Sequence, residues 1–306
     1  MIPSEVGFGL PKEKFCVRIC TVVFDASIGW TDHINDFNYS VGANVTYSRF
    51  WDWEQYKPRF SNSWDEYRNS IWHRVGYVNW GYEAVGRFNS WEEIANYPID
   101  NDRKGNRTVV PGDIKYKDQN NDGVINYLDE RPIGYRVDST PTLNFGINLA
   151  ASWKGFDLAM DWTGSGMTSW QQCYETARPF QNDGNSPDEV LKDAWHLSDI
   201  WDANSELIPG KYPMLRLNSD ETSAYDKSTF WLHNVHYIKL RNLEFGYTLP
   251  KNWLGRSGIS NLRVFVSGTN LLTLSNLSVM DPECVSDNGL DYPPMRVINL
   301  GVNLKF

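Results

Sequence analysis

The segment DQNNDGVINYLD, at residues 118–129, combines residue types at a spacing that could hold a metal ion. Hard oxygen donors recur along it, and Gly123 stands at the sixth position, where such a loop must turn sharply. An EF-hand-like loop wraps one calcium ion with this order of donors. The spacing predicts a calcium site whose ligands would be Asp118, Asn120, Asp122, the carbonyl of Val124, Asn126 and Asp129.

The same segment also fits a surface turn that is held by its own side-chain hydrogen bonds. Asn and Asp side chains commonly form such turns with nearby backbone amides. The loop departs from the calcium pattern in that Asp129 replaces the usual bidentate glutamate at position twelve, and no flanking helices are evident. The residues leave both interpretations open.

The other residues that could perform chemistry do not form a recognised arrangement. His233 and His236 lie three apart in a predicted strand, which would point them to opposite faces. Adjacent acids such as Asp65 and Glu66 are not thereby placed across a glycosidic bond. No GxSxG, Walker or GxGxxG motif occurs. We therefore predict that the chain is not an enzyme and takes no cofactor besides calcium.

The four cysteines show no paired CxxC spacing. A metal pair at Cys16 and Cys20 would lack the second pair or the nearby histidine that completes a tetrahedral site. We expect unpaired thiols at Cys16, Cys20, Cys173 and Cys284.

Composition narrows the class of protein. The 306 residues carry a formal net charge of −9, which argues against a nucleic-acid partner, because such a partner needs a basic surface. Aromatic residues make up 14% of the chain, and with abundant Asn, Ser, Thr and Gly they favour strands and turns. No apolar run reaches the roughly eighteen residues of a membrane helix, whereas a membrane strand needs only alternate apolar residues.

Several segments alternate apolar and polar residues with period two, which gives each predicted strand one apolar and one polar face. The runs approach the roughly nine to eleven residues of a tilted membrane strand and exceed the roughly five to six of a globular strand. Aromatic residues gather near the strand ends, as in the girdles of membrane barrels. The clearest runs are 22–31, 37–48, 143–153, 156–163 and the terminal RVINLGVNLKF, which ends on Phe306.

Two further predicted strands, at 235–248 and 261–272, alternate less regularly. In the first, the apolar phase shifts between Leu240 and Leu243, and a β-bulge there would restore the facing. The last strand ends on an aromatic carboxy-terminal residue and resembles the sorting signal read by the outer-membrane assembly machinery.

The lengths of the connections predict one orientation. Short turns are expected at 32–36, 153–155 and 249–260, and long connections at about 50–140, 165–234 and 273–293. Membrane barrels have short periplasmic turns and long extracellular loops. Within one long loop, SPDEVLKDAW predicts a short helix with Ser186 as N-cap, Pro187 in the first turn and Glu189 as the capping-box acid.

The segment 51–100 is rich in tryptophan and tyrosine. Flat aromatic faces can stack on sugar rings, but they also supply most of the buried area when loops pack. The tryptophans concerned are Trp51, Trp53, Trp64, Trp72, Trp80 and Trp91, and none is assigned to a ligand.

Four stretches, in order along the chain, resemble the SusC/RagA family of TonB-dependent outer-membrane transporters. The run GFDLAM at 155–160 fits the same family, and the likeness extends over nearly the whole chain. The four stretches are VGFGLPKE at 6–13, PGDIKYKDQNNDGVINYLDE at 111–130, YIKLRNLEFGYTLPKNWL at 237–254 and ISNLRVFVSGTNLLTLS at 259–275.

The resemblance implies the import of glycans or peptides across the outer membrane. Such transporters couple to a periplasmic TonB protein, carry a SusD-like lipoprotein as a lid, contact outer-membrane lipid, and close about 22 strands around a plug. The fold class that follows is all-β: the C-terminal part of a large antiparallel transmembrane β-barrel, with about seven strands and long extracellular loops, over residues 1–306.

The chain departs from the family in having no recognisable plug domain, TonB box or signal peptide, and FCVRICTVV at 15–23 reads poorly against it. These departures predict that Met1 is an internal start and that transport is the activity of a longer parent. One alternative is a secreted soluble β-sandwich that binds carbohydrate through its aromatic residues. Another is the non-functional product of a decayed gene.

Overall fold

The computed structural model describes residues 17–55, 59–137, 140–217, 221–255, 258–284, 288–289 and 291–306. The resembling stretch at 6–13 and Cys16 lie outside these residues. The chain divides into two compact units, one running to Val23 and then from Ser48 to Tyr77, the other comprising Phe24–Tyr47 and Val78–Phe306.

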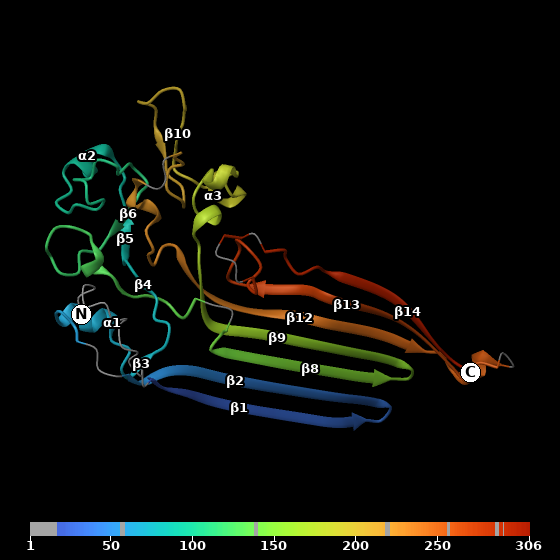
Figure 1. The fold of residues 1–306 in the computed structure, drawn as a ribbon. Coiled ribbons are helices and arrows are strands. Elements are labelled where there is room, and N and C mark those ends of the chain that lie inside the picture. The colour runs from blue at the N-terminus through green and yellow to red at the C-terminus, as the bar shows by residue number, and fades with distance from the viewer. Residues whose placement is uncertain are drawn as a thin grey trace, which may run out of the picture. The chain divides into compact units, whose positions relative to one another are not determined.

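Seven long strands follow one another in a single sheet in the order β1-β2-β8-β9-β12-β13-β14 (Figure 1). The predicted all-β class and the number of long strands are confirmed. From β2 to β14 each of these strands pairs antiparallel with the next in this order, and β1 and β14 are the two ends of the sheet. The strands are β1 Val17–Ile34, β2 Phe37–Gln55, β8 Leu143–Trp153, β9 Phe156–Gln171, β12 Leu232–Thr248, β13 Asn261–Ser275 and β14 Val297–Lys305.

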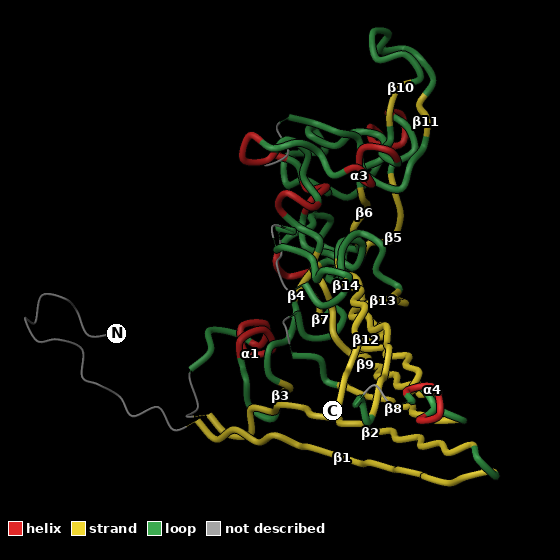
Figure 2. Tube along the Cα trace, turned by 90° about the vertical axis from the view of Figure 1, so that its right-hand side faces the viewer, coloured by secondary structure: helices red, strands yellow, loops and turns green. Residues whose placement is uncertain are grey.

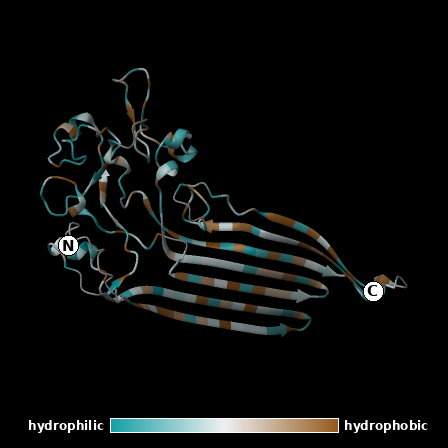
Figure 3. Ribbon diagram, in the orientation of Figure 1, coloured by the Kyte–Doolittle hydropathy of each residue, from teal (hydrophilic) through white to brown (hydrophobic). Residues whose placement is uncertain are grey.

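The register places the apolar residues of neighbouring strands on one face. Val41 pairs with Leu149, Leu149 with Met160, and Met160 with Leu243, so one apolar row crosses four strands. Figure 3 shows the alternation as bands of contrasting hydropathy along the strands. Large side chains on this face are exposed, as at Leu300, which is 81% accessible. In the described part of the chain no second sheet covers them, so the β-sandwich alternative is wrong.

The predicted bulge in β12 is confirmed. The pairing of β12 with β9 steps from Leu240–Trp162 to Asn242–Asp161, which leaves Arg241 as the extra residue. Leu240 and Leu243 can then share the apolar face although they are three residues apart. A second bulge, at Gly166–Met167 of β9, was not predicted, and Met167 there has φ +55°.

The short connections all lie at one end of the sheet. Asn35–Asp36 joins β1 to β2, and Lys154–Gly155 joins β8 to β9. Lys154 and Gly155 both have positive φ, 47° and 91°, as a two-residue hairpin turn requires. The third connection, from β12 to β13, includes α4 at Lys251–Leu254. The expected division into short and long connections is confirmed.

The long connections fold into small elements of their own, which Figure 2 shows as loop with short pieces of helix and strand. In the first unit these are α1 Ser63–Asn69 and β3 Arg74–Val75. In the second they are β4 Trp80–Gly81, β5 Ala84–Arg87, α2 Trp91–Ala95, β6 Ile114–Tyr116, β7 Arg131–Pro132, α3 Asp188–Lys192, β10 His196–Leu197 and β11 Leu207–Ile208, with 3₁₀ turns at Tyr127–Asp129, Tyr174–Thr176, Gln181–Asp183 and Ser223–Tyr225.

The buried core of the second unit lies in these connections. Trp231 is 1% exposed, stacks on Tyr212 and Tyr225, and donates its indole N–H to the Ala224 carbonyl at 2.8 Å. Val190 of α3 is buried in the same cluster. The connections therefore fold around their own apolar centre.

The helix predicted in SPDEVLKDAW is present as α3, but its predicted cap is wrong. The N-cap is Pro187, which makes no side-chain cap hydrogen bond, and the helix begins at Asp188. Glu189 is not a capping-box acid because its carboxylate accepts hydrogen bonds from Lys211 Nζ and Tyr212 Oη, both at 3.1 Å. Contacts with Lys211 and Tyr212, which are distant in sequence, thus replace the capping role that the local pattern predicts for Glu189.

No helix in the described ranges is both long and apolar enough to cross a membrane.

Candidate functional site

The face of the sheet opposite the apolar rows carries polar and charged side chains. Asn148, Asp161 and Asn242 form one row across β8, β9 and β12, and Asn148 Nδ2 donates to Asp161 Oδ1 at 2.7 Å. A membrane strand that turns one face to lipid turns the other to the barrel lumen. This polar face is therefore the candidate functional surface of the sheet.

Near the short-turn end of the sheet, Arg263 forms an ion cluster across three strands. Its Nε donates to Asp157 Oδ1 at 3.0 Å, and its Nη2 donates to Glu244 Oε1 at 2.6 Å and to the second Asp157 oxygen. The guanidinium crosses β12 directly above Gly246, where a Cβ would lie 2.7 Å from the guanidinium carbon. Glycine at 246 is thus what lets an arginine of β13 reach an acid of β9.

A second ion cluster lies at Lys239 and Arg241, around the β12 bulge. Lys239 is 1% exposed, and its ammonium contacts both oxygens of Asp281, at 2.6 and 2.8 Å, and Glu283 Oε2 at 3.0 Å. Arg241 pairs with the other oxygen of Glu283 and donates to Asn270 Oδ1 at 3.1 Å. Lys239 and Arg241 are two residues apart on β12, so both cations meet acids of a single loop.

That loop, residues 276–284, follows β13 and is called here the strap. Leu277 of the strap packs with Trp170 and Val235 in a buried cluster, and Val279 and Met280 lie against it. Asn276 fixes the start of the strap, since its amide bonds the backbone of Asn234 and His236. Apolar packing at one end and ion pairs at the other hold the strap against β12.

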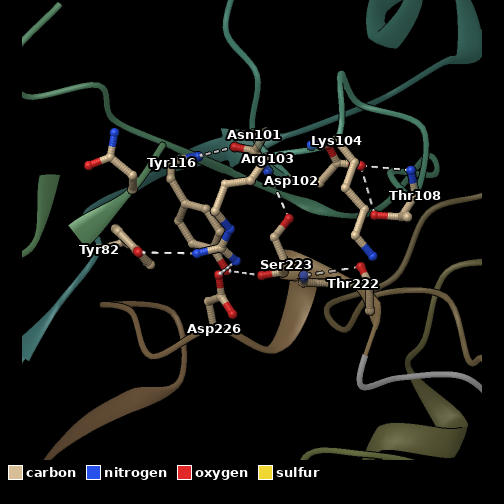
Figure 4. Close-up of polar contacts among 12 residues, drawn as sticks. Tyr82, Asn101, Asp102, Arg103, Lys104, Thr108, Tyr116, Thr222, Ser223 and Asp226 are labelled. Carbon is tan, nitrogen blue, oxygen red and sulfur yellow. Dashed lines mark hydrogen bonds and ion pairs between the residues drawn. The ribbon is translucent and has the colours of Figure 1, made fainter. Parts of the chain in front are cut away.

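The connections contain a buried polar network between residues 100–116 and 222–226 (Figure 4). Asn101 donates to the carbonyl of Ile114 at 3.0 Å and to Ser223 Oγ at 3.3 Å, and accepts from the Tyr116 amide at 3.0 Å. Tyr116 Oη donates to the Ser223 carbonyl at 2.7 Å. Figure 4 also shows Arg103 between Tyr82 and Asp226; the Arg103–Asp226 pair measures 2.8 Å.

Asp102 organises the tight turn at 102–108. Its carboxylate accepts hydrogen bonds from the amides of Lys104, Asn106 and Thr108 and from the Thr108 hydroxyl, at 2.7–2.8 Å. Burial alone would raise the pKa of this carboxyl, but the four donors outweigh it and lower the pKa to about 2. The turn is therefore closed around an anionic carboxylate.

The predicted calcium loop is closed by internal hydrogen bonds. Asp118 accepts from the amides of Asn121 and Gly123, and buried Asp129 accepts from those of Gln119 and Asn126. Gly123 has φ +82°, as expected at the sharp turn. Hydrogen bonds from nearby amides, chiefly that of Val124, lower the pKa of Asp122.

In the loop, Asn120 and Asn126 bond other loop residues. Asn120 Oδ1 accepts from the Asp122 amide at 3.0 Å, and Asn126 Nδ2 donates to the Val124 carbonyl at 3.1 Å. Within the described ranges, no group of three or more His, Cys, Asp or Glu side chains is placed to hold a metal ion. The hydrogen bonds fit the turn interpretation, and calcium stays a prediction.

The tryptophans named from the sequence are divided between packing and exposure. Trp80 is buried in its unit, whereas Trp53, Trp72 and Trp91 are exposed. A stronger candidate for an exposed aromatic lies elsewhere: Trp201, between β10 and β11, is 91% accessible. Richness in tryptophan alone did not indicate which side chains are exposed.

Cys20 and Cys284 are free thiols in the structure, as expected. His233 lies against Gln172, 3.0 Å from its Oε1, and stacks on Trp170. His236, in contrast, lines an apolar groove. The prediction that the two imidazoles would not form one site agrees with this arrangement.

The ion clusters of the polar face were missed by sequence reasoning. A usable signal was present, because charges at inward positions of an otherwise alternating strand are unusual and need partners. Asp157 and Glu244 occupy such positions. Their partner Arg263 could not be assigned, since it lies 19 residues from Glu244 and 106 residues from Asp157.

No protein-family model matches the chain. Among curated proteins, it is 30% identical over 241 residues to "TonB-dependent receptor P3" of Formosa agariphila and 28% identical over 241 residues to "TonB-dependent receptor P26" of the same organism. These alignments cover 73% and 74% of this chain and 22% of each relative. The chain thus spans about a fifth of the length of the receptors it matches.

Among solved structures, the chain is similar to the RagAB peptide importer in its "open-open" and "closed-closed" states, with TM-scores of 0.64 and 0.63. The identity is 22% in each case, and the superposition covers all of this chain and 30% or 31% of the other. These likenesses give the fold: a section of the wall of a transporter barrel.

Proposed function

Because the chain belongs to the TonB-dependent receptors of the SusC/RagA type, which are outer-membrane proteins, we propose that it forms the C-terminal wall of a barrel that imports large nutrients. The observation that carries this proposal is the two-faced sheet. One face exposes large apolar side chains on every strand, and the other carries fixed charges and a folded strap. A wall between lipid and an aqueous lumen needs these two faces.

The open edges of the sheet support a larger assembly. Unpaired backbone groups cannot face lipid without a large penalty, so a membrane sheet must be closed. We propose that β1 and β14 each pair with further strands of a barrel. Transport is then a property of that whole barrel, and this chain supplies the strap and about seven strands.

The nutrient class is proposed as glycans or peptides. The RagAB structures are of a peptide importer, and this supports peptides as directly as the exposed aromatics support glycans. Growth tests separate the two: a strain lacking the gene should lose growth on one of these classes as sole source, and complementation should restore it. Unchanged growth and uptake on both classes would contradict the import proposal.

Two partners follow from the proposal. A SusD-like lipoprotein would cover the end that bears the long connections, as the pairing in RagAB suggests, and a TonB protein would supply energy from the periplasm. Affinity purification of the tagged receptor from outer membranes should recover a lipoprotein in near-equal amount. Recovery of the receptor alone under mild detergent would contradict the lid, and transport that persists in a tonB-deficient strain would contradict the coupling.

For the loop 118–129 we propose calcium binding at Asp118, Asn120, Asp122, Val124, Asn126 and Asp129. The support for this proposal is the spacing of the oxygen donors around Gly123, whose φ of +82° gives the sharp turn that such a loop needs. Calcium in the millimolar range should raise the thermal stability of the receptor, and Asp122→Ala should abolish that increase. If the thermal stability does not change up to millimolar calcium, the calcium proposal is wrong and the loop is a turn closed by its own hydrogen bonds.

A further inference from the structure

An apolar groove of about 550 Å³ lies between β8, β9, β12 and β13. Its walls include Leu143 and Phe145 of β8, Ile238 of β12 and Leu274 of β13, with Gly166 of β9 in its floor. The register places Phe145, Ile238 and Leu274 in one cross-strand row of the apolar face, through Gly164. All four strands are consecutive neighbours in the sheet, so this chain alone forms the groove.

Two glycines of β9 create the hollow. The Phe145 ring lies over Gly164 and fills the space that a side chain there would take. At Gly166, by contrast, a Cβ would meet only the Cβ of His236 at 3.8 Å and a Leu143 methyl at 3.9 Å, which are ordinary contact distances. The bulge at Gly166–Met167 lies beside this point, opposite His236. Space for a ligand is therefore left above Gly166.

The groove has a polar end and an apolar end. His236, Ser275 and Asn276 lie at its end nearest the long connections, whereas Phe145 and Ile238 lie about 7 Å further toward the short turns, by two residues of strand rise. His236 is exposed, and its imidazole makes no hydrogen bond or ion pair within the described part of the chain. The polar end would lie at headgroup level, since long connections of such barrels are extracellular.

We propose that this groove binds an acyl chain of an outer-membrane bilayer lipid, with the polar headgroup of that lipid at His236. The groove is continuous with the apolar face that the membrane covers, and its polarity changes along the strands in the same direction as that of a lipid. Bilayer lipid is also the molecule present at highest concentration against this face. The site is separate from import, so failure of the nutrient proposal would not affect it.

The test fills the groove without disturbing the strand. Gly166→Leu places a side chain in the hollow at a position whose φ is not left-handed. Ala151→Leu is the matched control, because it adds the same side chain to the apolar face of β8 outside the groove. Leu274→Trp fills the groove from the β13 side and keeps the test usable if Gly166→Leu does not fold.

The receptor and each variant would be extracted from native outer membranes in mild detergent, incubated with 1-palmitoyl-2-oleoyl-phosphatidylethanolamine, and weighed by native mass spectrometry. Heat-dependent mobility on gels identifies folded barrels. Wild type and Ala151→Leu should retain one more lipid per chain than Gly166→Leu or Leu274→Trp. Equal retention by all four proteins would overturn the proposal, as would a retained mass that corresponds to a lipoprotein anchor and not to a bilayer lipid.

Discussion

Many large apolar side chains on one face of the sheet are exposed, whereas the connections 78–137 and 172–231 bury a cluster of apolar side chains. Leu300 is 81% accessible in β14, and Trp231, directly before β12, is 1% accessible. The apolar face of the sheet is suited to contact with lipid, and the charged side chains lie on the opposite face. The connections bury their apolar residues in a core, as proteins in water do. The chain therefore exposes apolar residues on its strands and buries them in its connections. The two patterns meet where the strands pass into the long loops.

The largest expected effect concerns the core of the connections. Trp231→Ala should lower the free energy of unfolding of this region by about 3–5 kcal/mol, since it removes a buried indole and its hydrogen bond to Ala224. Leu300→Ala should cost less, at most about 2 kcal/mol, because it loses only the transfer of three carbons from water to lipid and leaves no cavity in a packed core. Hydrogen exchange on the purified receptor measures both. Similar losses for the two variants would break the comparison.

The strap should respond next. Lys239→Met leaves Asp281 and Glu283 without their buried cation, and breaking such a pair costs roughly 3 kcal/mol where the acids are partly exposed. The exposed pair of Lys117 with Glu83 is the control, because Lys117→Met should cost no more than about 1 kcal/mol. Limited proteolysis at the strap reports the difference. A strap that remains as protected in Lys239→Met as in wild type would show that its apolar contacts suffice.

A smaller effect is expected at Gly246. Gly246→Ala places a methyl group against the guanidinium of Arg263, and such overpacking costs about 1–3 kcal/mol. Gly29→Ala, in β1, has no atom within 4 Å of the added carbon and should be neutral or slightly stabilising. Thermal unfolding in detergent compares the variants. The double variant Gly246→Ala/Arg263→Ala should be no less stable than Arg263→Ala alone, because the guanidinium that the methyl group would meet is gone. If the losses of the two single variants simply add, Arg263 does not pass over Gly246.

The smallest effect is one of pH. The pKa of Asp102 is lowered to about 2, so its contribution to stability is complete above about pH 4 and is lost as the pH falls toward 2. Burial raises the pKa of Asp226 and acts in the opposite sense, so the comparison must be made with Asp102→Asn. Protection of residues 102–108 should fall with acid in wild type and should be flatter with pH in the variant. Parallel curves would contradict the role of Asp102.

Period-two alternation was enough to predict the long strands, their apolar face and the bulge at Arg241, because the lipid face imposes a local rule on every second residue. The strap, the ion clusters and the cap of α3 were not predictable in the same way. Lys239 meets Asp281 only after β13 and a turn have been placed, and Glu189 leaves the capping position because Lys211 and Tyr212 come from another segment.

The fold of the long connections was harder to predict than that of the sheet. Their buried residues, such as Ile114 and Tyr116, come from short segments whose pairing has no periodic signal. The acidic loop 118–129 was found from spacing alone, but spacing does not distinguish a metal loop from a turn closed by its own amides.

The central claim is that one face of the sheet lies against lipid and the other against water. Single cysteines at Val266 and Ser267, neighbours in β13, would be introduced with the native cysteines replaced by serine, and each labelled with bimane. In vesicles of dibrominated phosphatidylcholine, the label at 266 should be strongly quenched relative to unbrominated vesicles, and the label at 267 should be quenched instead by aqueous iodide. Equal quenching of both labels by the brominated lipid, or none at 266, would contradict the account.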